Sequence, residues 1–233
     1  MKFGNKALLA ISFALMLAVS EGSFAQLPGG LPKLGGGGAS GGSESDVTAS
    51  QDQIVKAYIA ANTEILRGQS KLEEALGDKK DATDLENKAA AYSSGATTKD
   101  LQGQDTVIND AQATIDQLLK NKAQLDDRAR ATYVEGLVHL GVGLEATVLL
   151  RDKAVQFGQS AQALIRSASI IDKGRLTTKL TAGTYVAQKL PGHMKSTYDT
   201  LNRAIAFAQN NNISVPSDPT KAVNDFLKAG SAG

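Results

Sequence analysis

Apolar side chains recur every three or four positions along most of this chain, and this spacing constrains the fold more than any other feature of the sequence. It matches the 3.6-residue period of an amphipathic α-helix, whereas a half-buried strand needs strict alternation. The only short stretch that resembles a strand is 213–215. The sequence therefore predicts an all-α fold. In residues 48–76 the helical pattern is carried by Ile54, Val55, Tyr58, Ile59, Ile65, Leu66, Leu72 and Leu76.

Glycine, proline and capping residues predict where the helices begin and end. Asp126 is expected to cap the longest helix, a break is expected at 170–174, and Pro191 is expected to kink or end a later helix. Because the breaks are short, neighbouring helices should pack antiparallel. We predict an antiparallel up-and-down helical bundle of about five long helices plus a short C-terminal helix. The predicted helices are 48–76, 82–93, 100–122, 126–167, 176–190, 192–210 and 218–227.

The first 25 residues have the three parts of a secretory signal peptide. Lys2 and Lys6 give a basic start, residues 7–19 form an apolar run, and Ser23 and Ala25 are small residues of the kind that precede a cleavage site. The apolar run is shorter than the roughly 20 residues that cross a bilayer. We therefore expect cleavage after Ala25 and export to a bacterial periplasm or the cell exterior. The mature protein is predicted not to be an integral membrane protein.

Three further segments follow the predicted signal peptide. Residues 26–46 are rich in Gly, Pro and Ser, a composition that is typical of a flexible linker. This linker is either a tether that gives the folded part reach or an unselected N-terminal tail. Residues 47–212 are predicted to form the helical bundle, and residues 213–233 a short terminal helix and tail.

Charge and composition exclude several classes of function. The chain has 25 Lys and Arg residues against 24 Asp and Glu residues, and 5% of its residues are aromatic. A nearly neutral chain does not attract phosphate backbones, and few aromatic side chains are present to stack on bases. We therefore expect no nucleic-acid partner. The chain also has no cysteine, so its stability must come from an apolar core without disulfides.

The stretch from Tyr133 to Leu150 is apolar on nearly every side, which is typical of a helix enclosed by others. Its polar groups give the candidate ligand-binding residues Tyr133, Glu135, His139 and Glu145. Glu135 and His139 are four positions apart, so they share a helix face and could offer two metal ligands. Glu145 follows six positions after His139 and points elsewhere. We expect Glu135 and His139 to form a structural pair and predict no metal site.

Residues 141–146 match the pattern GxGxxA, which occurs in dinucleotide-binding loops. That site needs a preceding strand within a βαβ unit, and the surrounding residues predict a continuous helix instead. We therefore expect Gly136, Gly141 and Gly143 to let a neighbouring helix approach closely. The charged groups in the same stretch argue against a membrane span, and a core helix is the better interpretation.

No pattern in the sequence supports catalysis. The chain has neither a cysteine nor a GxSxG motif, and Ser196 follows His193 by three positions on what should be one helix face. We predict no catalytic residue, no cofactor and no enzyme activity. The leading hypothesis is an exported, non-catalytic protein-binding or scaffold module. One alternative is a carrier of an apolar or amphipathic small molecule bound between helices, and a less favoured one is a metal-binding protein or enzyme that uses Glu135 and His139.

Overall fold

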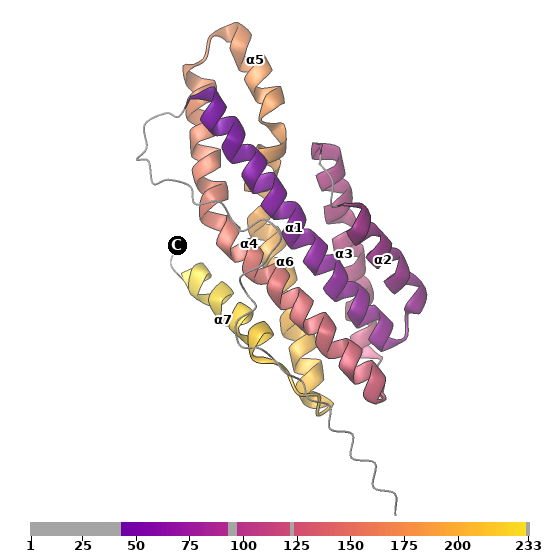
Figure 1. Ribbon diagram of the computed structural model, residues 1–233. Coiled ribbons are helices and arrows are strands. Elements are labelled where there is room, and N and C mark those ends of the chain that lie inside the picture. Colours follow the sequence, from indigo (N-terminus) through magenta and orange to yellow (C-terminus); the bar gives the residue numbers. More distant parts are fainter. Residues whose placement is uncertain (1–42, 93–96, 122–123, 232–233) are drawn as a thin grey trace, which may run out of the picture. The chain divides into compact units, whose positions relative to one another are not determined.

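The structure is a computed structural model that describes residues 43–92, 97–121 and 124–231. These residues form seven α-helices and no strand, so the described part of the chain is all-α, as the sequence predicts (Figure 1). The predicted signal peptide and residues 26–42 of the predicted linker lie outside the described residues. The helices are α1 (Glu44–Leu76), α2 (Lys79–Ala91), α3 (Thr98–Lys120), α4 (Asp127–Ser167), α5 (Ile170–Lys179), α6 (Thr181–Asn210) and α7 (Ser217–Ser231).

Short polar side chains fix the beginnings of several helices. Ser43 caps α1, and the side chain of Asp46 accepts a hydrogen bond from the Ser43 backbone in return. Helix α1 therefore begins at Glu44, three residues before the predicted start of the bundle at residue 47. Asp126 Oδ1 accepts a hydrogen bond from the Ala129 N–H at 2.8 Å. This contact confirms the predicted cap of α4.

Two predicted breaks between helices are not where the sequence suggests. Residues 170–174 are not a break, because Ser169 caps a helix that begins at Ile170. Pro191 does not end a helix, because α6 continues through it. Leu190 and Met194 are buried on either side of the exposed proline, and this burial holds the helix together although proline has no N–H to donate. The chain changes helix at Leu180 instead.

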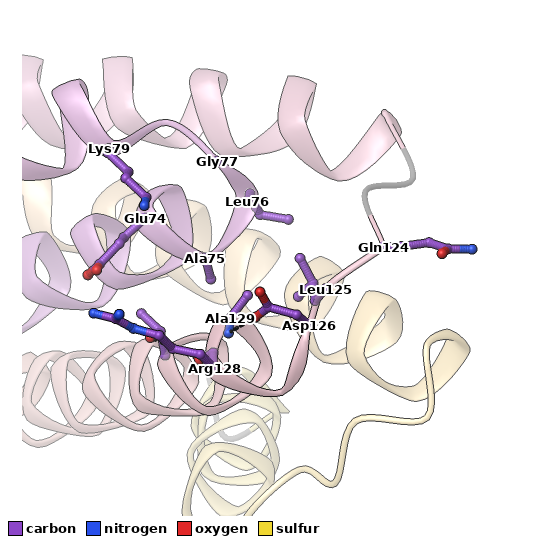
Figure 2. Close-up of a pocket in the computed structure, with 11 residues that line it drawn as sticks. Glu74, Ala75, Leu76, Gly77, Lys79, Gln124, Leu125, Asp126, Arg128 and Ala129 are labelled. Atoms are coloured by element: carbon purple, nitrogen blue, oxygen red, sulfur yellow. Dashed lines mark hydrogen bonds between the residues drawn. The ribbon is translucent and has the colours of Figure 1, made fainter.

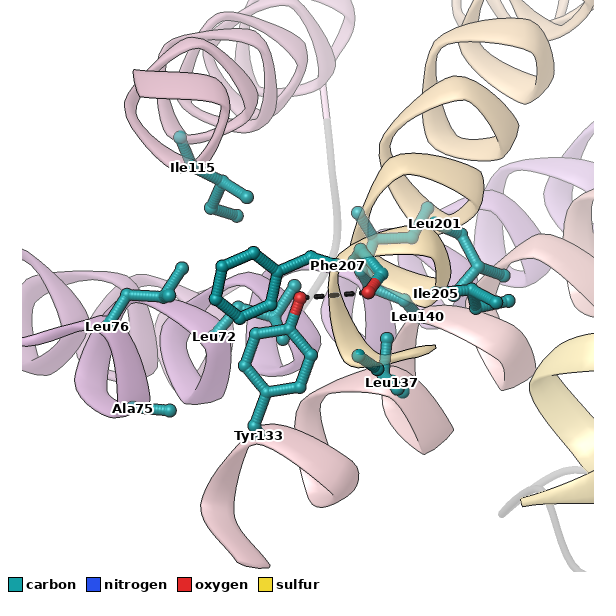
Figure 3. Packing of buried hydrophobic residues seen from close by; sticks show 14 of the residues in the cluster. Leu72, Ala75, Leu76, Ile115, Tyr133, Leu137, Leu140, Leu201, Ile205 and Phe207 are labelled. Atoms are coloured by element: carbon teal, nitrogen blue, oxygen red, sulfur yellow. Dashed lines mark hydrogen bonds between the residues drawn. The ribbon is translucent and has the colours of Figure 1, made fainter. Parts of the chain in front are cut away.

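Helix α1 packs along α4, and α2 and α3 also lie against α1. Helix α6 contacts α1, α3 and α4, while α7 packs mainly on α4. The buried hydrophobic side chains form two clusters. Figure 3 shows part of the first, in which side chains from α1, α3, α4 and α6 meet. The residues labelled there are Leu72, Ala75, Leu76, Ile115, Tyr133, Leu137, Leu140, Leu201, Ile205 and Phe207.

Glycines of α4 lie where other helices come close. A Cβ atom on Gly136 or Gly143 would lie within 2.9 Å of a side chain of α1. A Cβ atom on Gly141 would lie 2.9 Å from Pro219 Cα, near the start of α7. These distances confirm the prediction that the three glycines let neighbouring helices approach closely. Because residues 141–146 lie wholly inside α4, they do not form the strand-to-helix loop of a dinucleotide site.

Helix α4 is long and apolar enough to cross a membrane by length and composition alone. Half of its most apolar window is buried against the rest of the protein. Leu137, Leu140 and Leu144 are completely buried. Burial of this kind is typical of a core helix, which is the interpretation that the sequence favours.

Candidate functional site

Polar side chains fill the space where α1, α3 and α6 meet. At the centre is Asp105 of α3, whose carboxylate accepts hydrogen bonds from tyrosine hydroxyls on the two other helices. Tyr58 Oη of α1 lies 2.7 Å from Asp105 Oδ1, and Tyr185 Oη of α6 lies 2.5 Å from Oδ2. Asn62 Nδ2 lies 3.5 Å from Oδ1. Asp105 is therefore held from two sides by helices that are far from it in the sequence.

Both tyrosine hydroxyls keep their protons at ordinary pH. Burial raises the pKa of Tyr58, and the negative charge of Asp105 raises it further. Burial also raises the pKa of Tyr185, and the hydrogen bond to Asp105 acts in the same direction. Each hydroxyl therefore remains a donor to the carboxylate, and the three side chains form a fixed polar unit.

His193 of α6 lies beside this unit. Its ring centroid is 5.2 Å from that of Tyr58, and the residue is 7% exposed. Burial lowers the pKa of the imidazole, although the charge of Asp105 opposes this effect. The Nε2 atom is buried and has no hydrogen-bond partner among the described residues. A neutral imidazole with an unused nitrogen is therefore present at this junction.

Ser196, one turn after His193, does not bond to the imidazole. Its hydroxyl donates a hydrogen bond to Gln112 Oε1 of α3. The Nε2 atom of Gln112 is buried and lacks a partner within the described part of the chain. The serine and histidine that share this helix face therefore do not form a nucleophile and base.

We call the group formed by Tyr58, Asn62, Asp105, Tyr185 and His193 the polar junction. A groove of about 620 Å³ runs over it between α3 and α6. This volume falls within the range of small-molecule sites. Carboxylate, amide, hydroxyl, amine and imidazole groups face it, so it offers both donors and acceptors to a polar ligand. The groove is lined by Gln102, Asp105, Thr106, Asn109, Tyr185, Lys189, Gly192, His193 and Ser196.

A second hollow, of about 440 Å³, lies beside the α1–α2 turn and the start of α4 (Figure 2). Its acidic side chains already have structural partners. Asp126 caps α4, and Glu74 lies 3.6 Å from Lys71. Gln124 points away from the other labelled residues. We take the α3–α6 groove as the candidate site because its lining includes His193, whose buried Nε2 atom has no hydrogen-bond partner among the described residues, next to the Asp105 carboxylate.

The structure does not bring the four predicted ligand-binding residues together. Tyr133 is fully buried in the core, where its hydroxyl donates to the Ala204 carbonyl at 3.0 Å and its ring packs on Phe207 (Figure 3). Glu135 is exposed on α4. Their role in binding a ligand stays a prediction, but these two residues do not line the α3–α6 groove.

His139 and Glu145 each bond to a different helix. His139 Nδ1 lies 2.7 Å from Glu64 Oε2 of α1, so its observed partner is Glu64 rather than the expected Glu135. The hydrogen bond from His139 lowers the pKa of Glu64. Glu145 pairs with Lys221 of α7 at 2.8 Å. Within residues 43–92, 97–121 and 124–231, no group of three or more acidic or histidine side chains could hold a metal ion.

The polar junction leaves a signal in the sequence that helix periodicity alone does not use. Asn62 and Gln69 of α1 occupy positions in the buried stripe that also holds Tyr58, Ile65 and Leu72. Amides in a buried stripe need partners on the facing helix. Asn62 bonds to Gln104 Oε1 at 3.3 Å, and Gln69 bonds to the Ile108 carbonyl at 2.9 Å. The stripe identifies one side of the junction but not the helix that faces it.

Comparison of the chain with protein-family models, with curated proteins and with solved structures found no match.

Proposed function

We propose that this chain is an exported, non-catalytic helical-bundle protein that binds another protein, and that the α3–α6 groove takes a polar segment of that partner. The observation that carries the proposal is the buried polar junction beneath the groove. Tyr58 and Tyr185 hold the Asp105 carboxylate in place, while His193 keeps an unused nitrogen beside it. Fixed donors and acceptors in a groove suit the recognition of a peptide segment.

The hydrogen bond that the Ser196 hydroxyl already makes supports a binding role rather than a catalytic one. The hydroxyl of Ser196 is already used by Gln112, and the groove has no serine bonded to an imidazole. Acyl transfer needs a nucleophile within hydrogen-bond reach of its base. A groove that offers only fixed polar contacts is better suited to holding a ligand than to transforming it.

We also propose that the helices are arranged as an antiparallel up-and-down bundle. The order of contacts between α1 and α4 supports this arrangement. Gly136 faces Leu72, whereas Gly143, further along α4, faces Ile65, which comes earlier in α1. The two helices therefore run in opposite directions where they touch. Long antiparallel helices would leave extended side faces for a partner, as a scaffold role requires.

Export remains part of the proposal and has a direct test. The basic start, apolar run and small residues before position 26 support it. Fractionation of the producing cell should place the protein outside the cytoplasm, and N-terminal sequencing should begin at Gln26. A cytoplasmic protein that keeps Met1 would contradict export without affecting the groove.

Site-specific photo-crosslinking in the producing cell tests the binding role. A photoreactive residue at Thr106, exposed in the groove, should form one discrete adduct with another protein. The same residue at Asp152, exposed on α4 and outside the groove, is the matched control. The Thr106 adduct should be lost in a Tyr185→Phe/His193→Phe background. Equal adducts at both positions, or an adduct that survives the substitutions, would contradict the proposal.

The alternative of a carrier for an apolar or amphipathic molecule has less support. It requires space around residues 133–150, where Gly136 and Gly143 pack directly on α1. Native mass spectrometry of the purified protein distinguishes the two functions. A co-purifying apolar molecule would favour the carrier over the proposed protein-binding module.

A further inference from the structure

Two adjacent isoleucines, Ile170 and Ile171, are almost completely exposed at the start of α5. Their exposed fractions are 90% and 89%, whereas the other large exposed hydrophobic residues of the described segments, Leu149, Val155 and Leu227, are 50–54% exposed. Single half-exposed apolar side chains are ordinary on protein surfaces. Two adjacent, almost fully exposed isoleucines form a contiguous apolar patch, and such patches are typical of surfaces that bind a protein or a membrane.

The fold holds these two side chains in place. The turn between α4 and α5 lies at the end of the helical unit away from the α1–α2 turn (Figure 1). Ser169 caps α5, and Leu176 is buried on the far side of the helix. Arg175 makes two hydrogen bonds to Glu44 at 2.6 and 2.7 Å, which attach α5 to the start of α1. The isoleucines are therefore presented on an anchored helix end.

Basic residues are close to the pair in the sequence on both sides of it, although the whole chain is nearly neutral. Arg175 pairs with both Glu44 and Asp172, and Lys179 pairs with Glu44, so these two basic side chains are balanced by two acidic ones. Arg166 and Lys173 are exposed and form no ion pair with any described residue. The surface next to the isoleucines therefore carries unbalanced positive charge, which attracts an anionic surface. Residues 164–179 contain the basic residues Arg166, Lys173, Arg175 and Lys179 and the single acidic residue Asp172.

We propose that residues 166–173, the α4–α5 tip, bind the surface of an anionic lipid bilayer. Ile170 and Ile171 enter the boundary between headgroups and acyl chains, while Arg166 and Lys173 contact the lipid phosphates. Shallow apolar insertion combined with basic side chains is the physical basis of interfacial binding. Such binding is peripheral and leaves the core helices in place. It does not depend on the α3–α6 groove.

Co-sedimentation of the full chain with lipid vesicles tests the proposal. Vesicles of phosphatidylcholine mixed with phosphatidylglycerol should bind the protein, and the Ile170→Ser/Ile171→Ser variant should bind at least about tenfold more weakly. The Arg166→Gln/Lys173→Gln variant should lose about tenfold on these vesicles and little on pure phosphatidylcholine. Because all variants keep the same N-terminal residues, the comparison isolates the tip from the apolar run at 7–19.

The Leu149→Ser/Leu227→Ser variant is the matched control, since it removes two other exposed apolar side chains and should bind like the unaltered chain. Circular dichroism verifies that each variant keeps its helices. Equal vesicle binding with and without the isoleucines would overturn the proposal, as would no binding at all. If the isoleucine variant loses only self-association or binding to a protein, the tip is a protein interface and the lipid proposal is wrong.

Discussion

Helix α1 makes two very different interfaces with its neighbours. Towards α4 it presents Gly68, which lies so close to the partner helix that a Cβ atom would be 2.7 Å from the Leu140 backbone nitrogen. Towards α3 it presents Asn62 and Gln69, which bond to polar atoms of that helix. Close packing of small and apolar residues dominates the first interface, whereas the second adds hydrogen bonds between buried polar groups to its apolar packing.

The two interfaces also differ in how completely polar groups are satisfied. Six buried side-chain atoms in the described part of the chain lack a hydrogen-bond partner, and five of them belong to residues on or beside α3. A buried polar group without a partner costs about 1–3 kcal/mol. The α1–α4 side therefore supplies stability, whereas the α3 side gives some up, and one of its residues with an unpaired atom, His193, lines the groove. The five residues are Asn62, Gln69, Glu73, Gln112 and His193.

The largest expected change in stability is at the α1–α4 interface. In Gly68→Ala the new Cβ would lie 2.7 Å from Leu140 N and 2.9 Å from Gly136 O, both backbone atoms of α4, so the helices must separate. We expect the free energy of unfolding to fall by about 3 kcal/mol in urea denaturation. Gly103→Ala, at an exposed position of α3 with nothing within 4 Å, is the control and should gain about 0.5 kcal/mol. Equal stability of both variants would contradict close packing.

Asp105→Ala tests how much the hydrogen bonds of the polar junction stabilise the protein. The substitution leaves the hydroxyls of Tyr58 and Tyr185 without their acceptor, so the free energy of unfolding should fall by about 2 kcal/mol. Asp110→Ala, on the exposed side of the same helix, should change it by less than about 0.5 kcal/mol. Chemical denaturation of both variants measures the difference. If Asp105→Ala is no worse than the control, the polar unit does not hold α3 in place.

Glu73→Gln should increase the free energy of unfolding at neutral pH. Burial raises the pKa of Glu73 from 4.5 to about 8, and the charges of Asp78 and Asp81 act in the same direction. A carboxyl with a raised pKa in the folded state binds its proton more tightly when folded, so its contribution is complete below pH 4.5 and is lost as the pH rises to about 8. We expect Glu73→Gln to gain about 1.5 kcal/mol at neutral pH.

Denaturation of this variant at two pH values separates the titration from a general packing effect. The gain over the unaltered chain should shrink when the pH is lowered to 4.5, where Glu73 is protonated in the folded protein. A gain that is the same at both pH values would show that the raised pKa is not its cause.

His193→Phe is expected to have the smallest effect on stability. Phenylalanine keeps the ring contact with Tyr58 and removes the buried Nε2 atom that lacks a partner, so the free energy of unfolding at neutral pH should change by less than about 1 kcal/mol. Burial lowers the pKa of His193 below 6.5, so its contribution is present above pH 6.5 and is lost as the pH falls through the lowered value. The variant should therefore lose less stability than the unaltered chain on acidification.

The same variant distinguishes a structural histidine from a binding one. If His193 serves the groove, His193→Phe should keep its stability and lose the crosslink from Thr106. A variant that unfolds easily at neutral pH would show that the imidazole is needed for packing.

Local features of the fold were predictable because their causes lie close together in the sequence. The helical spacing and the Asp126 cap follow from residues within a few turns of each other. The three glycines in one apolar stretch indicated that neighbouring helices come close there, but not which helices they are. The prediction that a helix ends at Pro191 was wrong, because burial of its neighbours on α6 outweighed the missing hydrogen bond. His139 was expected to pair with Glu135 within its own helix, but the helix that faces it supplied Glu64.

By itself the sequence determined that the described chain is helical and, to within two residues, where α3, α4 and α7 begin, since backbone hydrogen bonds and apolar stripes depend on residues three and four positions apart. Only the tertiary structure decided which faces meet. Asp105 lies 47 positions after Tyr58 and 80 before Tyr185, and helix periodicity says nothing about groups so far apart. The polar junction and its groove exist because three helices pack with these side chains at one level, which depends on the packing of the whole unit.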